Sequence, residues 1–328
     1  MEKVYFKDMP LDKVSTAVCA VMSMEERQTK TQSSYVVFQL SDGKTTIMAN
    51  LWSTRLEDVK AAVGTLLTVR VYKKLYNGAD SYEVQSYGPA PAGENIAGYV
   101  PSAPYRGEDL YNEILKTMRA QPPRTDGKKS LFEMVDRIYT VNHDALIHWA
   151  AAKSIHHNYV AGLVYHVFRM LRMGICALKV YEAPNPGVPP INAEVLLSAI
   201  CLHDIGKLVE LSTNEIGATD YTVDGNLFGH SLLGIEIVNA EVARAEAEGN
   251  PYDAEAVRML KHCIASHHGR LDFGAITTPA TREAFILNSC DDLDAKMFQH
   301  EEQLAILERG TMSGKVFGLG GFVYSPNA

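Results

Sequence analysis

The feature that most constrains the fold is a change of hydrophobic periodicity at residues 88–107, a stretch rich in glycine and proline. Before it, apolar residues alternate in short runs bounded by turn residues, which is typical of strands. After it, apolar residues recur at three- and four-residue steps, which is typical of helices. We therefore expect an all-β domain over residues 1–90, a linker over residues 91–108 and an all-α domain over residues 109–328.

The first domain contains five predicted strands and one predicted helix. The strands are expected at residues 14–21, 35–40, 45–51, 66–72 and 82–87. The spacing of Leu56, Val59 and Val63 predicts a helix over residues 55–63, between the third and fourth strands. This order is typical of a five-stranded Greek-key barrel, the OB-fold, and an SH3-like small barrel is the main alternative.

The second domain contains seven predicted helices and an extended tail. The helices are expected at residues 108–119, 129–152, 158–181, 193–202, 230–248, 253–266 and 281–308. The last residues, 314–328, are rich in glycine and aromatic side chains and predict an extended tail. Because this tail has a double glycine and little charge, we do not expect it to bind substrate.

Composition and charge restrict the class of protein. The chain has 328 residues, of which 46% are apolar and 21% charged, as in ordinary globular proteins. It has no run of about 18 uncharged apolar residues, so we expect no membrane segment. The charged N-terminus and five scattered cysteines without a CxxC pair predict a cytoplasmic protein with reduced thiols. The net charge of −8 argues against a generally basic nucleic-acid binder, although a local basic groove stays compatible with it.

The strongest chemical signal is the string HDIGK, in which His203 and Asp204 follow an apolar helix. A neutral imidazole beside a carboxylate suits Mn²⁺, Fe²⁺, Co²⁺, Ni²⁺ or Zn²⁺. Alone, such a pair is more typical of a helix end at which Gly206 stops the helix. Further candidate ligands surround it along the chain, in the order His166, His230, His267, His268 and Asp291.

The order of these residues resembles the two-metal form of the HD-domain phosphohydrolase superfamily. The wider pattern resembles the YhaM family of 3′–5′ exoribonucleases, which join an N-terminal OB-fold to an HD domain. The strings that carry this likeness are HHNYVAGLVYH (156–166), HDIGK (203–207), SHHGRLDFG (266–274) and CDDLDAK (290–296). HDIGK alone occurs in many HD enzymes, so it is the combination that is specific. With the barrel, the resemblance covers about residues 5–325.

The resemblance implies two divalent ions, with Mn²⁺ expected and Fe²⁺, Co²⁺, Ni²⁺, Zn²⁺ or Mg²⁺ as alternatives. One ion would be held by His166, His203, Asp204 and Asp291, and Asp204 would bridge to a second ion held by His230, His267 and His268. In a helix, residues 291 and 294 share a face, and the family pattern puts the ligand at the first of them. We therefore expect Asp294 to contact a metal ligand rather than the metal ion itself.

The catalytic residues implied are Asp204 and Lys207, the latter neutralising charge on a phosphate oxygen. The alternative for Lys207 is a solvated cation at a helix end. His157 and Arg270 are candidate substrate contacts. The alternative for His157 is a surface histidine, and the alternative for Arg270 is a helix cap. On the barrel, the candidate substrate contacts are Trp52, Lys73, Lys74 and Tyr76. The alternative is that these residues occupy core positions or a solvated strand edge.

The residues alone imply metal-assisted phosphoester hydrolysis. The resemblance implies removal of nucleoside 5′-monophosphates from the 3′ end of single-stranded RNA, or single-stranded DNA, by a homo-oligomer. A second interpretation is an HD hydrolase of a cyclic or free nucleotide, although GRLDFG after His268 differs from the HHExxDGxGYP pattern of the cyclic-dinucleotide branch. A third is a nucleic-acid-binding regulator with a weak hydrolase site.

Overall fold

The computed structural model describes residues 4–76, 78–151, 159–182, 185–213 and 219–327. The chain divides into two compact units. The first runs to Ser102 and the second holds the helices that follow. Within the described ranges, no helix is long and apolar enough to cross a membrane.

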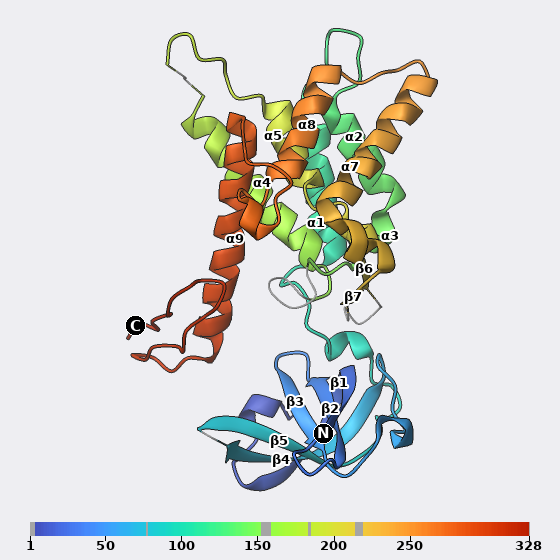
Figure 1. The fold of residues 1–328 in the computed structure, drawn as a ribbon, viewed down its shortest axis with the longest axis vertical. Helices are drawn as coiled ribbons and strands as arrows, with labels where there is room; N and C mark the ends of the chain where they lie inside the picture. Colours follow the sequence, from blue (N-terminus) through green and yellow to red (C-terminus); the bar gives the residue numbers. More distant parts are fainter. Residues whose placement is uncertain (1–3, 77, 152–158, 183–184, 214–218, 328) are drawn as a thin grey trace. The chain divides into compact units, whose positions relative to one another are not determined.

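The N-terminal unit is a closed five-stranded barrel (Figure 1). Its strands are β1 (Lys13–Gln28), β2 (Ser34–Ser41), β3 (Thr46–Leu51), β4 (Leu66–Tyr76) and β5 (Ala79–Pro89). They follow one another around the barrel as β1-β2-β3-β5-β4, and β1 pairs with β4 to close it. All neighbours are antiparallel except β3 and β5. This order confirms the OB-fold and excludes the SH3-like alternative.

The helix predicted over residues 55–63 is wrong. The segment contains only a 3-10 turn, η2 (Leu56–Asp58). Leu56 is 39% exposed and Val63 is 44% exposed, so the apolar spacing does not correspond to a buried helix face. A helix this short gains its stability from packing, and here Val59 packs against the barrel core while Leu56 and Val63 stay exposed.

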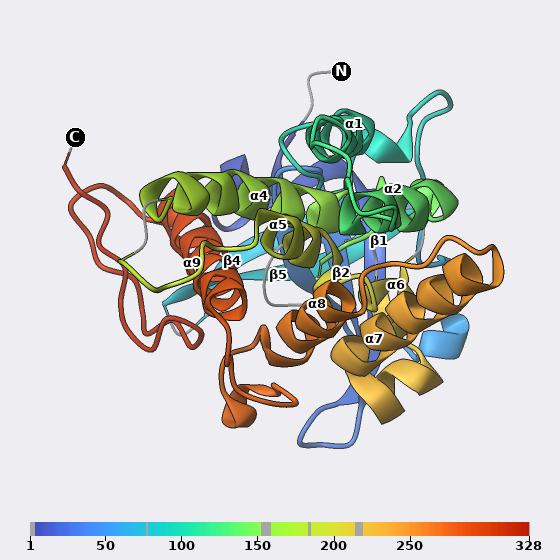
Figure 2. The same cartoon turned by 90° about the horizontal axis from the view of Figure 1, so that it is seen from above.

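The second unit is a bundle of α-helices. They are α1 (Gly107–Arg119), α2 (Leu131–Val141), α3 (His143–Leu146), α4 (Gly162–Val180), α5 (Ala193–Leu202), α6 (Lys207–Glu210), α7 (Val223–Ala247), α8 (Ala254–Ser266) and α9 (Arg282–Ile306). Every residue from 195 to 202 in α5 is buried. A helix that is apolar all round needs neighbours on all sides, and α5 packs against α2, α4, α8 and α9. Figure 2 shows α5 between α4 and α8.

Several helix boundaries differ from the prediction. The helix expected over residues 129–152 is divided, because Asn142 leaves the helical conformation between α2 and α3. The helix expected from residue 230 begins earlier, at Val223, and is kinked at Gly229, which has a φ of +70°. A small sheet of β6 (Leu211–Thr213) and β7 (Thr219–Tyr221) lies where no strand is predicted. The C-terminal tail is extended, as expected.

Candidate metal centre

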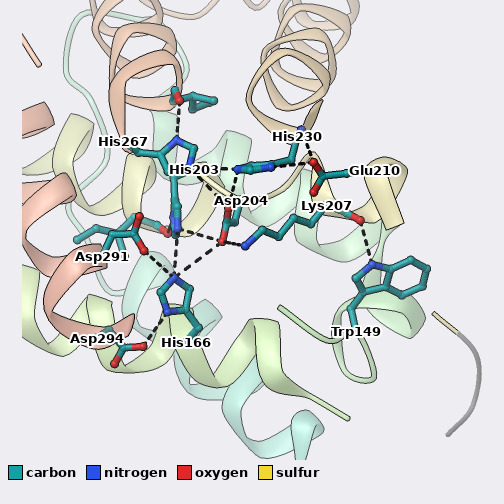
Figure 3. Close-up of polar contacts among 12 residues, drawn as sticks. Trp149, His166, His203, Asp204, Lys207, Glu210, His230, His267, Asp291 and Asp294 are labelled. Carbon is teal, nitrogen blue, oxygen red and sulfur yellow. Dashed lines mark hydrogen bonds and ion pairs between the residues drawn. The ribbon is translucent and has the colours of Figure 1, made fainter. Parts of the chain in front are cut away.

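Histidine and aspartate side chains from five helices of the bundle converge on one centre (Figure 3). His166 lies within α4, and Asp291 lies within α9. His203 and His267 are the residues at which α5 and α8 end. The helices therefore deliver ligands partly from their ends and partly from one face.

The glycine of HDIGK allows α7 to approach the centre. A Cβ atom on Gly206 would lie 2.0 Å from the carbonyl oxygen of His230 and 2.6 Å from the amide nitrogen of Gly234. Both contacts are to backbone atoms, which have little room to move. Any other residue at position 206 would therefore push away the helix that carries His230.

Asp204 occupies the middle of the centre and is only 3% exposed. Its Oδ2 atom lies 3.3 Å from Nε2 of His203 and 3.9 Å from Nε2 of His166. Its Oδ1 atom lies 3.4 Å from Nε2 of His230 and 3.8 Å from Nε2 of His267. Each carboxylate oxygen thus faces a different pair of histidines.

Two sets of potential metal ligands lie on the two sides of Asp204. In each set the ligand atoms all lie within 4.8 Å of one another. The sets are His166, His203 and Asp291, and His230, His267 and His268. Imidazole with carboxylate suits Mn²⁺, Fe²⁺, Co²⁺, Ni²⁺ and Zn²⁺.

Hydrogen bonds on the outer side of the histidines orient them for metal binding. Four Nδ1 atoms lie within hydrogen-bond distance of acceptors, namely His166 to Asp294 (2.7 Å), His203 to the Ile200 carbonyl (2.9 Å), His230 to Glu210 (3.0 Å) and His267 to the Ile264 carbonyl (2.7 Å). With Nδ1 donating outward, a neutral ring presents the lone pair of Nε2 to the centre. Among the described residues, the Nδ1 of His268 is buried without a hydrogen-bond partner. This donor set fits divalent cations.

The electrostatics of the centre favour the ligand forms of Asp204 and His267 but a protonated ring at His166. Burial raises the pKa of Asp204, but the nearby Lys207 and His203 outweigh burial and hold it well below its usual range. Burial and the neighbouring His268 lower the pKa of His267 well below its usual range. Burial also lowers the pKa of His166, yet hydrogen bonds from this ring to carboxylates outweigh it and raise the pKa to about 9. The carboxylates around His166 therefore favour a positive charge at this position.

Lys207 belongs to the same centre and is not a solvated helix-end cation. Its side chain is 9% exposed, and Nζ lies 2.6 Å from Oδ2 of Asp204. Its backbone carbonyl accepts a hydrogen bond of 3.0 Å from Nε1 of Trp149 (Figure 3). Lys207 lines a cavity of about 300 Å³ together with Asp204, His268 and Asp291. The cavity therefore opens directly onto the candidate ligands.

Arg270, one of the predicted substrate contacts, is not part of this cluster. Arg270 donates two hydrogen bonds to Asp272, of 2.9 and 2.8 Å, and its guanidinium lies 5.0 Å from the centre of the Phe273 ring. It is not among the described residues that line the cavity. His157 lies outside the described residues.

The barrel residues predicted to contact substrate differ in how far their side chains are exposed. Trp52 is 43% exposed, and Tyr76 is 66% exposed. Lys74 is partly exposed, with Nζ 2.6 Å from Glu83. Lys73, by contrast, is 7% exposed and its Nζ lies 2.8 Å from Asp80. Strand alternation explains the difference, since position 73 is on the buried side of β4.

Three residues that support the centre are not evident from the sequence. Glu210 accepts hydrogen bonds from both the backbone amide and the ring of His230, each of 3.0 Å. Nε of Arg169 lies 2.6 Å from Oδ1 of Asp294. Asn288 donates a hydrogen bond of 2.7 Å to the carbonyl of His267. No local sequence motif marks these three residues as supporting ones, because their partners are distant in the sequence.

The chain is similar to known proteins over most of its length. The HD domain family matches residues 163–296. The 3′-5′ exoribonucleases YhaM of Bacillus velezensis and Bacillus subtilis are each 31% identical over 289 residues, covering 87% of this chain and 86% of each relative. That of Shouchella clausii is 31% identical over 292 residues, covering 87% and 84%.

Among solved structures, the second OB-fold domain of replication protein A from Methanococcus maripaludis matches 28% of this chain and 99% of that domain. The sequence identity is 17% and the TM-score is 0.23. The family assignment rests on the YhaM relatives, which match 87% of this chain. With 31% identity to YhaM proteins across both units, the chain belongs to the YhaM family of 3′–5′ exoribonucleases.

Proposed function

We propose that this protein removes nucleotides from the 3′ end of single-stranded RNA in a metal-dependent hydrolysis that releases nucleoside 5′-monophosphates. The observation that carries the proposal is the position of Asp204, whose two carboxylate oxygens face two different sets of potential ligands. The names of the similar proteins supply the polarity and the substrate class.

Two divalent ions fit this arrangement. His166, His203 and Asp291 would hold one ion, and His230, His267 and His268 would hold the other. Asp204 would bridge them. Bound ions of this kind stabilise the attacking and leaving oxygens of an in-line displacement at phosphorus. We expect Mn²⁺, although this donor set also accepts Fe²⁺, Co²⁺, Ni²⁺, Zn²⁺ or Mg²⁺.

Residues around the ions would bind and orient the scissile phosphate. The Lys207 ammonium lines the cavity beside Asp204 and would neutralise charge that develops on a phosphate oxygen. The outward hydrogen bonds of His166 and His230 to carboxylates hold the two rings in position. The cavity volume of about 300 Å³ is at the lower end of small-molecule pockets, which suits one nucleotide at a time.

The barrel would bind the single strand through aromatic and basic side chains. Trp52 packs on Tyr35 with 4.7 Å between ring centroids, which leaves a partly exposed aromatic surface. Lys74 and Tyr76 lie towards the end of β4. Stacking on such rings tolerates any base, and single-stranded DNA would bind by the same contacts.

We also propose a homo-oligomer, in agreement with the family resemblance. Phe285 is 65% exposed, Leu293 is 49% exposed and Met297 is 43% exposed, and all three line a groove of about 1100 Å³ that is shared with residues of α4. Exposed apolar surface of this kind is typical of contacts between proteins. The mass of the particle in solution, measured by light scattering, tests it, and a monomer at all concentrations would contradict it.

A time course with 5′-end-labelled single-stranded RNA tests the proposed activity. With Mn²⁺ we expect a ladder that shortens from the 3′ end, and with a chelator we expect intact RNA. RNA that stays intact with excess metal would contradict the proposal and favour a cyclic or free nucleotide as substrate. RNA that is bound equally with and without chelator but never shortened would favour a regulator.

A further inference from the structure

The C-terminal tail is an ordered hairpin. Isolated antiparallel bridges join Met312 to Tyr324 and Val316 to Gly321. The amide of Ser313 donates a hydrogen bond of 2.8 Å to the carbonyl of Val323, and the amide of Val323 donates one of 2.8 Å to the Ser313 hydroxyl. Val323 is 1% exposed. The hairpin therefore has its own hydrogen bonds and a buried anchor.

The tip of this hairpin reaches the catalytic cavity. A turn is closed by a hydrogen bond of 3.1 Å from the amide of Gly320 to the carbonyl of Phe317. Gly318, within this turn, lines the same cavity as Asp204 and Lys207. A Cβ atom on Gly318 would lie 2.1 Å from Oε1 of Gln299, so the tip lies directly against α9.

Phe317 stands at this tip with its side chain 99% exposed. Its ring contributes almost nothing to the buried core, so packing within the hairpin does not account for it. A second ring, Phe273, is 65% exposed and lines the cavity itself. Exposed aromatic side chains beside a binding site are typical stacking surfaces for nucleobases.

The charges of the cavity match the rest of a nucleotide. Lys207 and Lys296 bring two ammonium groups to its lining, each 2.6 Å from a carboxylate, of Asp204 and Asp292, and Asp291 is a further carboxylate of the candidate metal centre. Ammonium groups bind phosphate, and an aromatic ring binds a base. The lining together with the hairpin tip therefore provides a contact for each part of a single nucleotide.

We propose that Phe317 stacks on the base of the 3′-terminal nucleotide, so that the hairpin tip helps to hold the chain end in the cleavage cavity. This inference rests on the proposed exoribonuclease function and names a substrate-positioning residue for it. It reverses the expectation that the tail has no part in substrate binding.

The test compares Phe317→Ala with Phe322→Ala on the cleavage of a short 5′-labelled RNA. Phe322 belongs to the same hairpin and is 60% exposed, but it lies beyond the Val316–Gly321 bridge, whereas Phe317 adjoins Gly318 of the cavity lining. Loss of one stacked base weakens binding by roughly 5- to 100-fold. We expect KM to rise by about tenfold in Phe317→Ala with little change in kcat. Phe322→Ala and Phe317→Trp should retain the wild-type KM.

A second substrate makes the test specific for stacking. On an otherwise identical RNA whose 3′-terminal ribose carries no base, wild type and Phe317→Ala should have the same KM, since the contact is already missing. An unchanged KM in Phe317→Ala on normal RNA, an equal loss in Phe322→Ala, or the same penalty on the abasic RNA would overturn the inference. These outcomes leave the proposed function intact, whereas failure of wild type to shorten RNA would overturn both. Because Phe317 is exposed, its replacement should leave Tm unchanged, which confirms folding.

Discussion

The contact between His166 and Asp294 supplies a quantitative prediction. The Asp294 carboxylate is 1% exposed and lies 2.7 Å from Nδ1 of His166 and 2.6 Å from Nε of Arg169. In Asp294→Asn, the side-chain amide oxygen still accepts a hydrogen bond from His166, but the negative charge behind the ring is lost. Changes of this kind behind a metal ligand cost about 10- to 100-fold in metal affinity. This corresponds to about 1.4 to 2.8 kcal/mol of binding free energy.

The assay is titration of chelator-treated enzyme with Mn²⁺, read as the rate of RNA shortening. The midpoint for Asp294→Asn should move to about 10- to 100-fold higher Mn²⁺, with most of the rate recovered at saturation. Glu301→Gln is the matched control, because Glu301 also pairs with Arg169 at 3.0 Å but its side chain is 53% exposed. Exposed pairs contribute little, so its midpoint should stay near that of wild type. An unchanged midpoint in Asp294→Asn, or an equal shift in Glu301→Gln, would refute the reasoning.

Three further predictions concern the ions, the HDIGK turn and the barrel. Removing metal should lower Tm by roughly 5–10 °C, because ligand at 100 times its Kd adds about 2.7 kcal/mol to the stability of the folded state. If differential scanning calorimetry finds the same Tm with and without chelator, that result would argue against a metal centre. Gly206→Ala should lower the free energy of unfolding, measured by chemical denaturation, by about 3 kcal/mol or more, because its Cβ would lie 2.0 Å from a backbone oxygen. Gly314→Ala, whose Cβ would have no atom within 4 Å, should leave the free energy of unfolding unchanged. Equal stability of the two variants would refute the close approach. Removing residues 1–90 should weaken binding of long RNA more than cleavage of a short nucleotide ester, and an equal loss of both would mean that the barrel is structural.

The order of the candidate ligands is visible in the sequence because each belongs to a short local string. HDIGK combines an apolar helix with its polar end, and the structure explains the glycine by the approach of α7. Helix geometry correctly predicts that Asp291 and Asp294 share a face, since both approach His166. Their roles as metal ligand and supporting residue stay predictions that the titration above tests.

The supporting contacts could not be predicted because they depend on tertiary structure. Glu210 is 20 residues from His230, and Arg169 is on a different helix from Asp294, so no spacing relates them. Hydrophobic periodicity also gave a wrong helix at residues 55–63, where Leu56 and Val63 have helical spacing but are exposed. It gave no indication that Gly318 would line the cavity, since a turn has no period.

The most direct test of the central claim uses single-stranded RNA that carries its label in the 3′-terminal nucleotide. With Mn²⁺, the first labelled product should be the nucleoside 5′-monophosphate, identified by mass, with no labelled fragment of intermediate length. Asp204→Ala should fold and release none of it, because Asp204 lies between both candidate ligand sets. Labelled oligonucleotides as first products, or full activity in Asp204→Ala, would contradict the account.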